Sequence, residues 1–167
     1  MAISPNGLIA RENGDEDWLL SENWDDFLIV AKQCGNIVMG RETYEIVTRM
    51  YKNYNFDSVD VDTKLIVTTN SKFQVPAGYK IVVSPEEARD FVKSKNFDNL
   101  LLLGGGKLNS SFMKKGLVDK IHLTINPYVL GKGRPFLWPE NFEYELKLES
   151  CENTSKDRVS LKYEVIK

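Results

Sequence analysis

The stretch LLLLGGGKL, residues 100–108, decides how the rest of the chain folds. Four consecutive leucines predict a strand at 100–103 that is buried on both faces, because strands covered on both sides are apolar throughout. The glycines that follow allow a tight turn, and 107–115 is expected to be helical. A strand, a glycine turn and a helix are typical of a parallel α/β sheet. The three glycines are therefore either a simple corner or a place where a ligand approaches the backbone.

Alternating strand and helix patterns continue on both sides of this stretch. Helices are expected at 21–33, 43–50 and 85–95, and strands at 1–4, 8–10, 37–39, 64–69, 80–83 and 120–125. Two further extended runs, 144–151 and 159–165, flank a polar link and predict an antiparallel hairpin. The sequence thus predicts one α/β domain over residues 1–167, with a mostly parallel central sheet and an antiparallel hairpin at its C-terminal edge. The first strand is expected to be clipped at Met1.

Composition excludes several classes of protein. The chain is 42% hydrophobic and 28% charged, as in ordinary globular domains, and its net charge of −2 does not favour a nucleic-acid or anionic-membrane partner. No apolar run approaches the length of a membrane-spanning helix, and no secretory signal is visible. Two cysteines and one histidine give little basis for a disulfide scaffold, a metal site or a Ser-His-Asp triad. We expect a cytoplasmic protein that binds a small molecule and no metal.

Small and hydroxyl-bearing residues follow four of the predicted strands. They are Gly40-Arg41, Thr68-Thr69, Ser84 and the glycines 104–106. Ligands of open α/β sheets bind at the carboxyl ends of the strands, where helix N-termini favour phosphates. Arg41 adds a planar cation suited to a phosphate. Each feature alone also fits an ordinary turn, strand or surface residue, but their joint placement predicts a nucleotide site.

Several of these motifs resemble one known family. They are VMGRETYE (38–45), the threonine pair after a buried strand, SPEEA (84–88), LLLGGGKL (101–108) and LVDKIHLTINPYVLGKGRPF (117–136). Together with the opening MAISPNGLIA, they resemble the dihydrofolate-reductase-like superfamily across essentially the whole chain. The similarity is greatest to the reductase domain of the riboflavin-biosynthesis deaminase-reductase. The implied fold is the three-layer dihydrofolate-reductase-like α/β fold.

The resemblance implies an NADPH-dependent reductase. By analogy with the family, the adenosine side with its 2′-phosphate would contact Arg41, Thr43, Thr68 and Thr69, with Gly40 and Ser84 at neighbouring strand ends. The pyrophosphate would lie against Gly104, Gly105, Gly106, Lys107 and Leu108, two of the glycines being joined by a cis peptide. The nicotinamide pocket would be lined by Ala2, Ile9 and Ala10.

The resemblance also implies a substrate site and a reaction. Trp18, Phe27 and Thr124 match residues that face the substrate, and Asn23 occupies the position of the carboxylate in dihydrofolate reductases. The expected reaction is hydride transfer to a C=N or C=O carbon of a small heterocyclic substrate, as in the pyrimidine reductase of riboflavin biosynthesis. The proton would come from water, or from Asp25 or Glu22.

Two alternatives and the oligomeric state stay open at this point. Dihydrofolate reductase activity is disfavoured by Asn23 and by Asp60 and Asp62, which would repel a folate carboxylate. A non-catalytic nucleotide-binding module would keep the glycines without the chemistry. A homodimer is expected by analogy, and the apolar residues Leu130, Phe136, Leu137 and Trp138 are either a dimer contact or local core.

Overall fold

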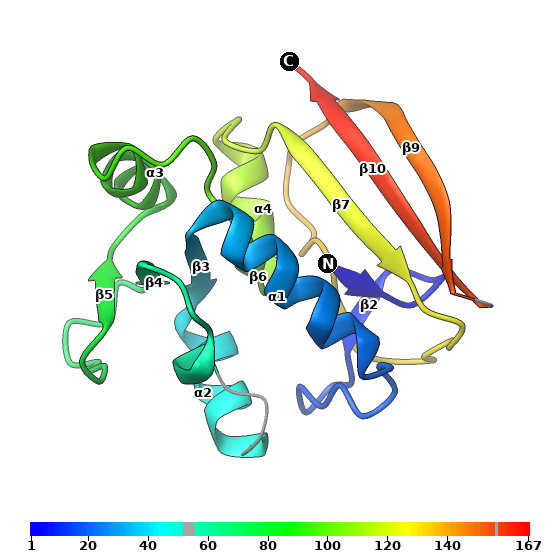
Figure 1. Ribbon diagram of the computed structural model, residues 1–167, viewed down its shortest axis with the longest axis horizontal. Coiled ribbons are helices and arrows are strands. Elements are labelled where there is room, and N and C mark those ends of the chain that lie inside the picture. The colour runs from blue at the N-terminus through cyan, green and yellow to red at the C-terminus, as the bar shows by residue number, and fades with distance from the viewer. Residues whose placement is uncertain (52–55, 156) are drawn as a thin grey trace.

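The computed structural model describes residues 1–51, 56–155 and 157–167. Its elements in chain order are β1 (Ala2–Ile3), β2 (Leu8–Ala10), α1 (Glu22–Cys34), β3 (Asn36–Gly40), α2 (Arg41–Met50), η1 (Phe56–Ser58), β4 (Thr63–Val67), β5 (Tyr79–Val82), α3 (Pro85–Ser94), β6 (Leu102–Gly104), α4 (Gly106–Lys114), β7 (Lys120–Ile125), β8 (Arg134–Pro135), β9 (Glu145–Ser155) and β10 (Arg158–Ile166) (Figure 1). The predicted α/β class is confirmed.

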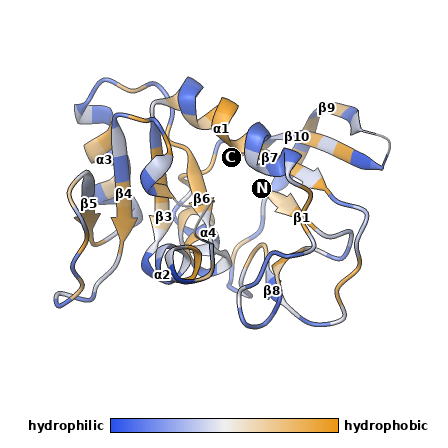
Figure 2. Cartoon of the chain, turned by 60° about the horizontal axis from the view of Figure 1, so that its bottom comes forward, coloured by the Kyte–Doolittle hydropathy of each residue, from blue (hydrophilic) through white to orange (hydrophobic). Residues whose placement is uncertain are grey.

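A parallel sheet of four strands, in the order β5-β4-β3-β6, forms the centre of the fold. Successive residues of β3 point to opposite faces, so Ile37 and Met39 pack in one hydrophobic cluster and Val38 packs in another. The first cluster includes Ala31 of α1 and Val47 of α2, while the second includes residues of α3 and α4. Two layers of helices therefore cover the sheet, and hydrophobic residues concentrate on its strands (Figure 2).

A second sheet has the order β1-β7-β10-β9. Its strand β1 runs parallel to β7, whereas β10 pairs antiparallel with both β7 and β9. The predicted C-terminal hairpin is therefore confirmed, but it is longer than expected. Cross-strand pairs such as Asn153 with Val159 continue the ladder through the stretch predicted to be a polar link. Backbone pairing with the neighbouring strand outweighs the low strand propensity of these residues.

Other differences from the predicted elements are small. Helix α2 begins at Arg41 rather than at Thr43, and α4 begins at Gly106, so each helix follows its strand almost directly. Strand β4 ends at Val67, before the threonine pair. The segment 51–62, predicted as irregular, contains the short helix η1, and its residues 52–55 lie outside the described part of the chain.

The apolar residues of the segment 130–138 belong mostly to the local core. Leu130 is buried, and Phe136 and Leu137 pack against buried residues of the second sheet and of α4. Trp138 is 45% exposed. The homodimer stays a prediction that rests on the family resemblance. Among the described residues, we find no helix long and apolar enough to cross a membrane, and no cluster of three or more metal-ligating side chains.

Candidate functional site

The carboxyl ends of the four central strands lie side by side. The parallel register pairs Met39 with Gly104, Gly40 with Val67, and Val67 with Val82. The residues that follow these positions are the ones the sequence selects: the glycines after β6, Arg41 after β3, the threonines after β4 and Ser84 close behind β5. The predicted convergence of these strand ends is confirmed.

A cavity of about 410 Å³ opens at the β3 and β6 end of this edge. Its lining includes much of the predicted cofactor set, namely Ile9, Ala10, Gly40, Thr43, Gly105, Gly106, Lys107 and Leu108. It also includes residues to which the sequence analysis gave no cofactor role, namely Met1, Glu12, Gly14, Glu16, Glu42, Ile46, Val47, Leu103, Gly133, Arg134, Pro135 and Trp138. The volume is within the range of small-molecule sites. Segments from four separate parts of the chain therefore form one site.

Two helices begin at this cavity without a side-chain cap. Gly40 is the N-cap of α2 and Gly105 is the N-cap of α4. In the described part of the chain, no side chain caps either helix start. The first backbone N–H groups of a helix lack partners within the helix, and the helix dipole makes this end attractive to anions. By contrast, the Ser84 hydroxyl caps α3 by accepting the Glu87 N–H at 3.1 Å. The uncapped starts of α2 and α4 thus suit a phosphate-bearing ligand.

The glycine turn joins these two helix starts. The Gly104–Gly105 peptide is cis, as the resemblance implies, and the φ of Gly104 is +91°, a region that favours glycine. The Gly105 N–H donates to Thr43 Oγ1 at 2.8 Å, which links the turn to α2. Gly106 has no room for a side chain, since a Cβ there would overlap with the carbonyl oxygen of Pro135. Gly106 therefore lets the Pro135 backbone lie against the start of α4, and the ligand role of the glycines stays a prediction.

The wall opposite the glycines is the segment 133–138, which includes β8. Buried side chains of α4 hold it in place: Asn109 Nδ2 donates to the Phe136 carbonyl at 2.8 Å, and Ser110 Oγ donates to the Trp138 carbonyl at 2.7 Å. A backbone bond from the Trp138 N–H to the Gly106 carbonyl, at 3.3 Å, adds to this attachment. The cavity therefore has a fixed wall.

The charged groups of the cavity are partly paired. Arg134 forms an ion pair with Glu42 at 2.6 Å, and this contact holds the pKa of the Glu42 carboxyl below its usual range. The Lys107 ammonium lies 5.1 Å from the ring centroid of Trp138, in the first turn of α4. Lys107 is thus a cation close to an uncapped helix start, where it would add to the attraction for an anion.

The remaining predicted cofactor residues lie outside the cavity. Arg41 pairs with Glu45 at 2.7 Å, and its guanidinium carbon lies 5.9 Å from the Phe73 ring centroid. The Thr68 hydroxyl accepts the Asn70 N–H, and Thr69 is exposed. Gly104 adjoins the cavity through Gly105, and Ala2 pairs with Thr124 between β1 and β7. Arg41, Thr68 and Ser84 extend along the same sheet edge as the cavity, so their predicted cofactor roles stay predictions.

The predicted substrate residues have their contacts outside the cavity. Trp18 is buried with its ring centroid 6.2 Å from that of Tyr128, and Phe27 packs with Trp24 at 5.0 Å. Asn23 Nδ2 donates to Asn126 Oδ1 at 2.8 Å, and the half-buried Thr124 lies on β7. None of the four predicted residues lines the described cavity. Their substrate roles therefore also stay predictions.

The two predicted proton donors are on the surface. Glu22 and Asp25 are both exposed in the first turn of α1, and neither lines the described cavity. Three glutamates do line it: Glu12 is exposed, Glu42 pairs with Arg134, and Glu16 is half-buried in the loop between β2 and α1. Burial, reinforced by the negative charge of Asp15, raises the pKa of Glu16 from 4.5 to about 7. No spacing or motif distinguishes Glu16 from the other acids of the segment 12–17, so the sequence gives no signal for it.

The fold has two layers of helices on a parallel sheet, with a cavity at the strand ends whose helix starts suit an anion. The RibD C-terminal domain matches residues 1–160, and the chain belongs to this family. It is also similar to the uncharacterized protein YwjB of Bacillus subtilis (strain 168), with 29% identity over 158 residues, which cover 89% of this chain and 86% of YwjB.

Solved structures show the same fold. A Shewanella sp. PV-4 protein, provisionally named for riboflavin biosynthesis, superposes with a TM-score of 0.84 at 22% identity, covering 100% of this chain and 97% of that one. The Thermotoga maritima deaminase/5-amino-6-(5-phosphoribosylamino)uracil reductase superposes with a TM-score of 0.70 at 16% identity, covering 99% of this chain and 55% of that one. Enterococcus faecalis dihydrofolate reductase complexed with NADP(H) superposes with a TM-score of 0.68 at 18% identity, covering 99% of this chain and 94% of that one. The predicted dihydrofolate-reductase-like fold is thereby confirmed.

Proposed function

We propose that this protein is an NADPH-dependent reductase that transfers a hydride to a C=N or C=O carbon of a small heterocyclic substrate. The observation that carries the proposal is the pair of uncapped helix starts, at Gly40 and Gly105, which open into one cavity beside the cis-linked glycines. Membership of the RibD C-terminal domain family supports a reductase, and the NADP(H) complex of a protein with the same fold supports this cofactor.

The residues of the cavity fit the cofactor in order along the sheet edge. The first N–H groups of α2 and α4, with Lys107, would hold the pyrophosphate. The apolar residues Ile9 and Ala10 would lie against the nicotinamide. Arg41 is the first residue of α2 and lies outside the cavity. Its guanidinium would release Glu45 and bind the 2′-phosphate instead.

The bound cofactor supplies the hydride, and the protein supplies position and exclusion of water. The Asn109 and Ser110 hydrogen bonds keep the wall 133–138 in place, so the cavity needs little reorganisation on binding. The name of the Thermotoga maritima neighbour supports a pyrimidine as the substrate class. Asn23, which lacks an ionisable proton and bonds to Asn126, supports a pyrimidine over dihydrofolate.

Cofactor titrations test the first half of this proposal. NADPH and NADH are titrated into the wild type, Arg41→Ala and Arg49→Ala, with cofactor fluorescence as the readout. Arg49 is an exposed residue in the last turn of the same helix and serves as the matched control. Arg41→Ala should weaken NADPH binding at least about tenfold, equivalent to about 1.4 kcal/mol, and leave NADH binding unchanged. Absence of NADPH binding to the wild type at millimolar concentration would refute the proposal.

Turnover tests the second half. NADPH oxidation is followed by absorbance with 5-amino-6-(5-phosphoribosylamino)uracil and, separately, with dihydrofolate. Oxidation with the aminouracil and not with dihydrofolate is expected. Tight NADPH binding without oxidation by a broad set of pyrimidines and pterins would identify a non-catalytic nucleotide-binding module instead.

A further inference from the structure

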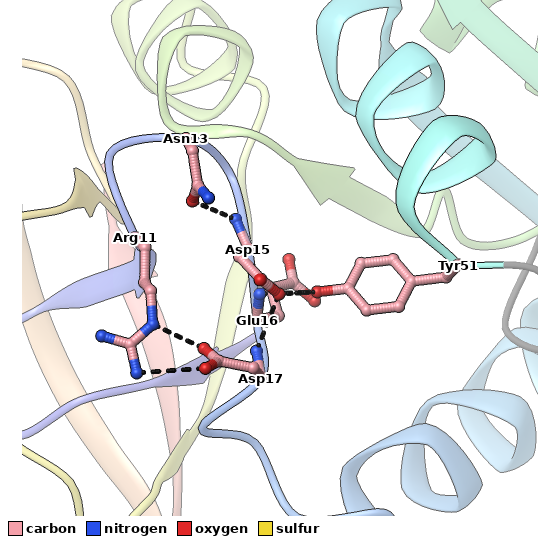
Figure 3. A network of polar contacts seen from close by, with 6 residues as sticks. All are labelled: Arg11, Asn13, Asp15, Glu16, Asp17 and Tyr51. Atoms are coloured by element: carbon pink, nitrogen blue, oxygen red, sulfur yellow. Dashed lines mark hydrogen bonds and ion pairs between the residues drawn. The ribbon is translucent and has the colours of Figure 1, made fainter.

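The loop between β2 and α1 is held in one conformation by its own side chains (Figure 3). Asn13 Oδ1 accepts the Asp15 N–H at 3.0 Å, and Asp15 Oδ1 accepts the Asp17 N–H at 3.1 Å. Arg11 pairs with Asp17 at 2.6 Å. These contacts fix the backbone on both sides of Glu16.

Tyr51, which follows the last residue of α2, fastens this loop to the helix. Its hydroxyl accepts the Glu16 N–H at 2.6 Å and donates to Asp15 Oδ1, also at 2.6 Å. The Asp15 carboxylate is thus occupied by Tyr51 and by the loop backbone. Figure 3 shows the Glu16 side chain beside the Tyr51 hydroxyl, between the loop and α2.

The Glu16 carboxyl itself is unengaged. It is half-buried and lines the cavity, and across residues 1–51, 56–155 and 157–167 it forms no hydrogen bond or ion pair. The same cavity contains the apolar side chains of Ile9, Ile46 and Val47. A carboxyl group placed in such surroundings favours its protonated form.

The other charged groups of the cavity do not offset this preference. Arg134 is committed to Glu42, Lys107 lies over Trp138, and Glu12 is exposed. On the loop, Asp15 is negative, and the cation Arg11 pairs with Asp17. Burial and the charge of Asp15 together raise the pKa of Glu16 to about 7, so that the group exchanges its proton near neutral pH.

We propose that Glu16 is the proton donor of this reductase. The inference rests on the proposed function. When the substrate carbon accepts the hydride, which NADPH provides, the π pair of the C=N or C=O bond moves to the nitrogen or oxygen. The O–H bond of the Glu16 carboxyl then breaks, its proton bonds to that nitrogen or oxygen, and Glu16 becomes a carboxylate. Water from the open cavity reprotonates it after NADP⁺ leaves.

Glu16→Gln preserves the shape of the side chain and removes the transferable proton. The matched control is Glu152→Gln, on the exposed face of β9 and far from the loop in sequence. The first measurement needs no turnover: carboxyl ¹³C resonances of glutamate-labelled protein are titrated with pH, with and without NADPH. The signal missing in Glu16→Gln is thereby assigned, and it should titrate near pH 7.

The second measurement is the pH profile of NADPH oxidation with 5-amino-6-(5-phosphoribosylamino)uracil. The wild-type rate should fall above about pH 7, whereas Glu16→Gln should lower kcat by about 10²- to 10⁴-fold and abolish this dependence. NADPH affinity should change less than about twofold, since Glu16 lines the cavity but is not among the residues proposed to hold the cofactor. Glu152→Gln should behave as the wild type.

Several outcomes would overturn the assignment. A Glu16 signal that titrates at the ordinary glutamate value, free and NADPH-bound, would do so even without turnover. An unchanged kcat and pH profile in Glu16→Gln would also overturn it. In that case, NADPH binding and turnover by the wild type would still support the reductase proposal. An increase in KM alone would make Glu16 a substrate anchor instead. Failure of the wild type to bind NADPH would remove the reductase proposal itself, and this inference with it.

Discussion

Replacing Gly106 with alanine should separate the two sides of the cavity. A Cβ at this position would overlap with the Pro135 carbonyl oxygen, a backbone atom that cannot rotate away. Either the start of α4 or the wall 133–138 must move, and overpacking of this kind costs about 1–3 kcal/mol. The same substitution also reduces the entropy of the unfolded chain, by about 0.4–1 kcal/mol, so a reference variant is needed.

Gly131→Ala provides that reference. Gly131 precedes the same wall, has no left-handed φ, and a Cβ there would meet no atom within 4 Å. The unfolded-state gain is common to both variants, so the difference between them isolates the overlap. Gly106→Ala should unfold at a temperature about 2–12 °C below that of Gly131→Ala, given about 2–4 °C per kcal/mol for a chain of this size.

Thermal unfolding and NADPH titration are the assays. Gly106→Ala should also bind NADPH at least about tenfold more weakly than Gly131→Ala, because the displaced backbone borders the proposed pyrophosphate position. Equal melting temperatures for the two variants would refute the steric reasoning. A large stability loss with unchanged NADPH affinity would show that the glycine serves packing alone.

Three further predictions follow from single side chains. Asn36 is buried, and its side chain makes three hydrogen bonds, to the backbone of Cys34, Asn99 and Leu101. Asn36→Ala should therefore lower the free energy of unfolding in urea by about 3 kcal/mol. Asn99→Ala keeps the backbone carbonyl that Asn36 binds and should lower it little. Ser84→Ala should destabilise the protein by about 1 kcal/mol and Ser84→Asp should restore the cap; equal unfolding midpoints for Ser84→Ala and wild type would contradict this assignment. The folded-state pKa of Glu16 is raised from 4.5 to about 7, so the free energy of unfolding of the wild type should decline as pH rises through this window. Urea unfolding at pH 5 and pH 8 should show a decline on the order of 2–3 kcal/mol, and Glu16→Gln should lack it.

The sequence predicts the central layer and the alignment of its strand ends because both depend on local patterns. Continuous apolar runs indicate buried parallel strands, and the residues after each run lie together once the strands are parallel. Ser84 followed by Pro85 is a local helix signal, and the helix begins there. The glycine turn combines a local pattern with a family resemblance, and its cis peptide follows the resemblance.

The remainder of the site depends on contacts between distant residues. Strand β8 is two residues long and lies where Asn109 and Ser110 hold the following chain, so no periodicity marks it. Glu16 differs from the neighbouring acids because it is buried in a loop that Tyr51, 35 positions away, fixes to the end of α2. Burial and pKa values of this kind arise from the assembled fold and not from the order of residues.

Helix α4 sets the width of the cavity. Its first residues form one side, and Asn109 and Ser110 hold the other side to the same helix. Phe112 and Met113, on the following turn, are almost fully buried in the two cores that α4 joins. A change of side-chain volume at either position would tilt the helix and so move both walls without touching a ligand. Core substitutions beneath α4 should therefore change the width of the cavity while its lining residues stay the same.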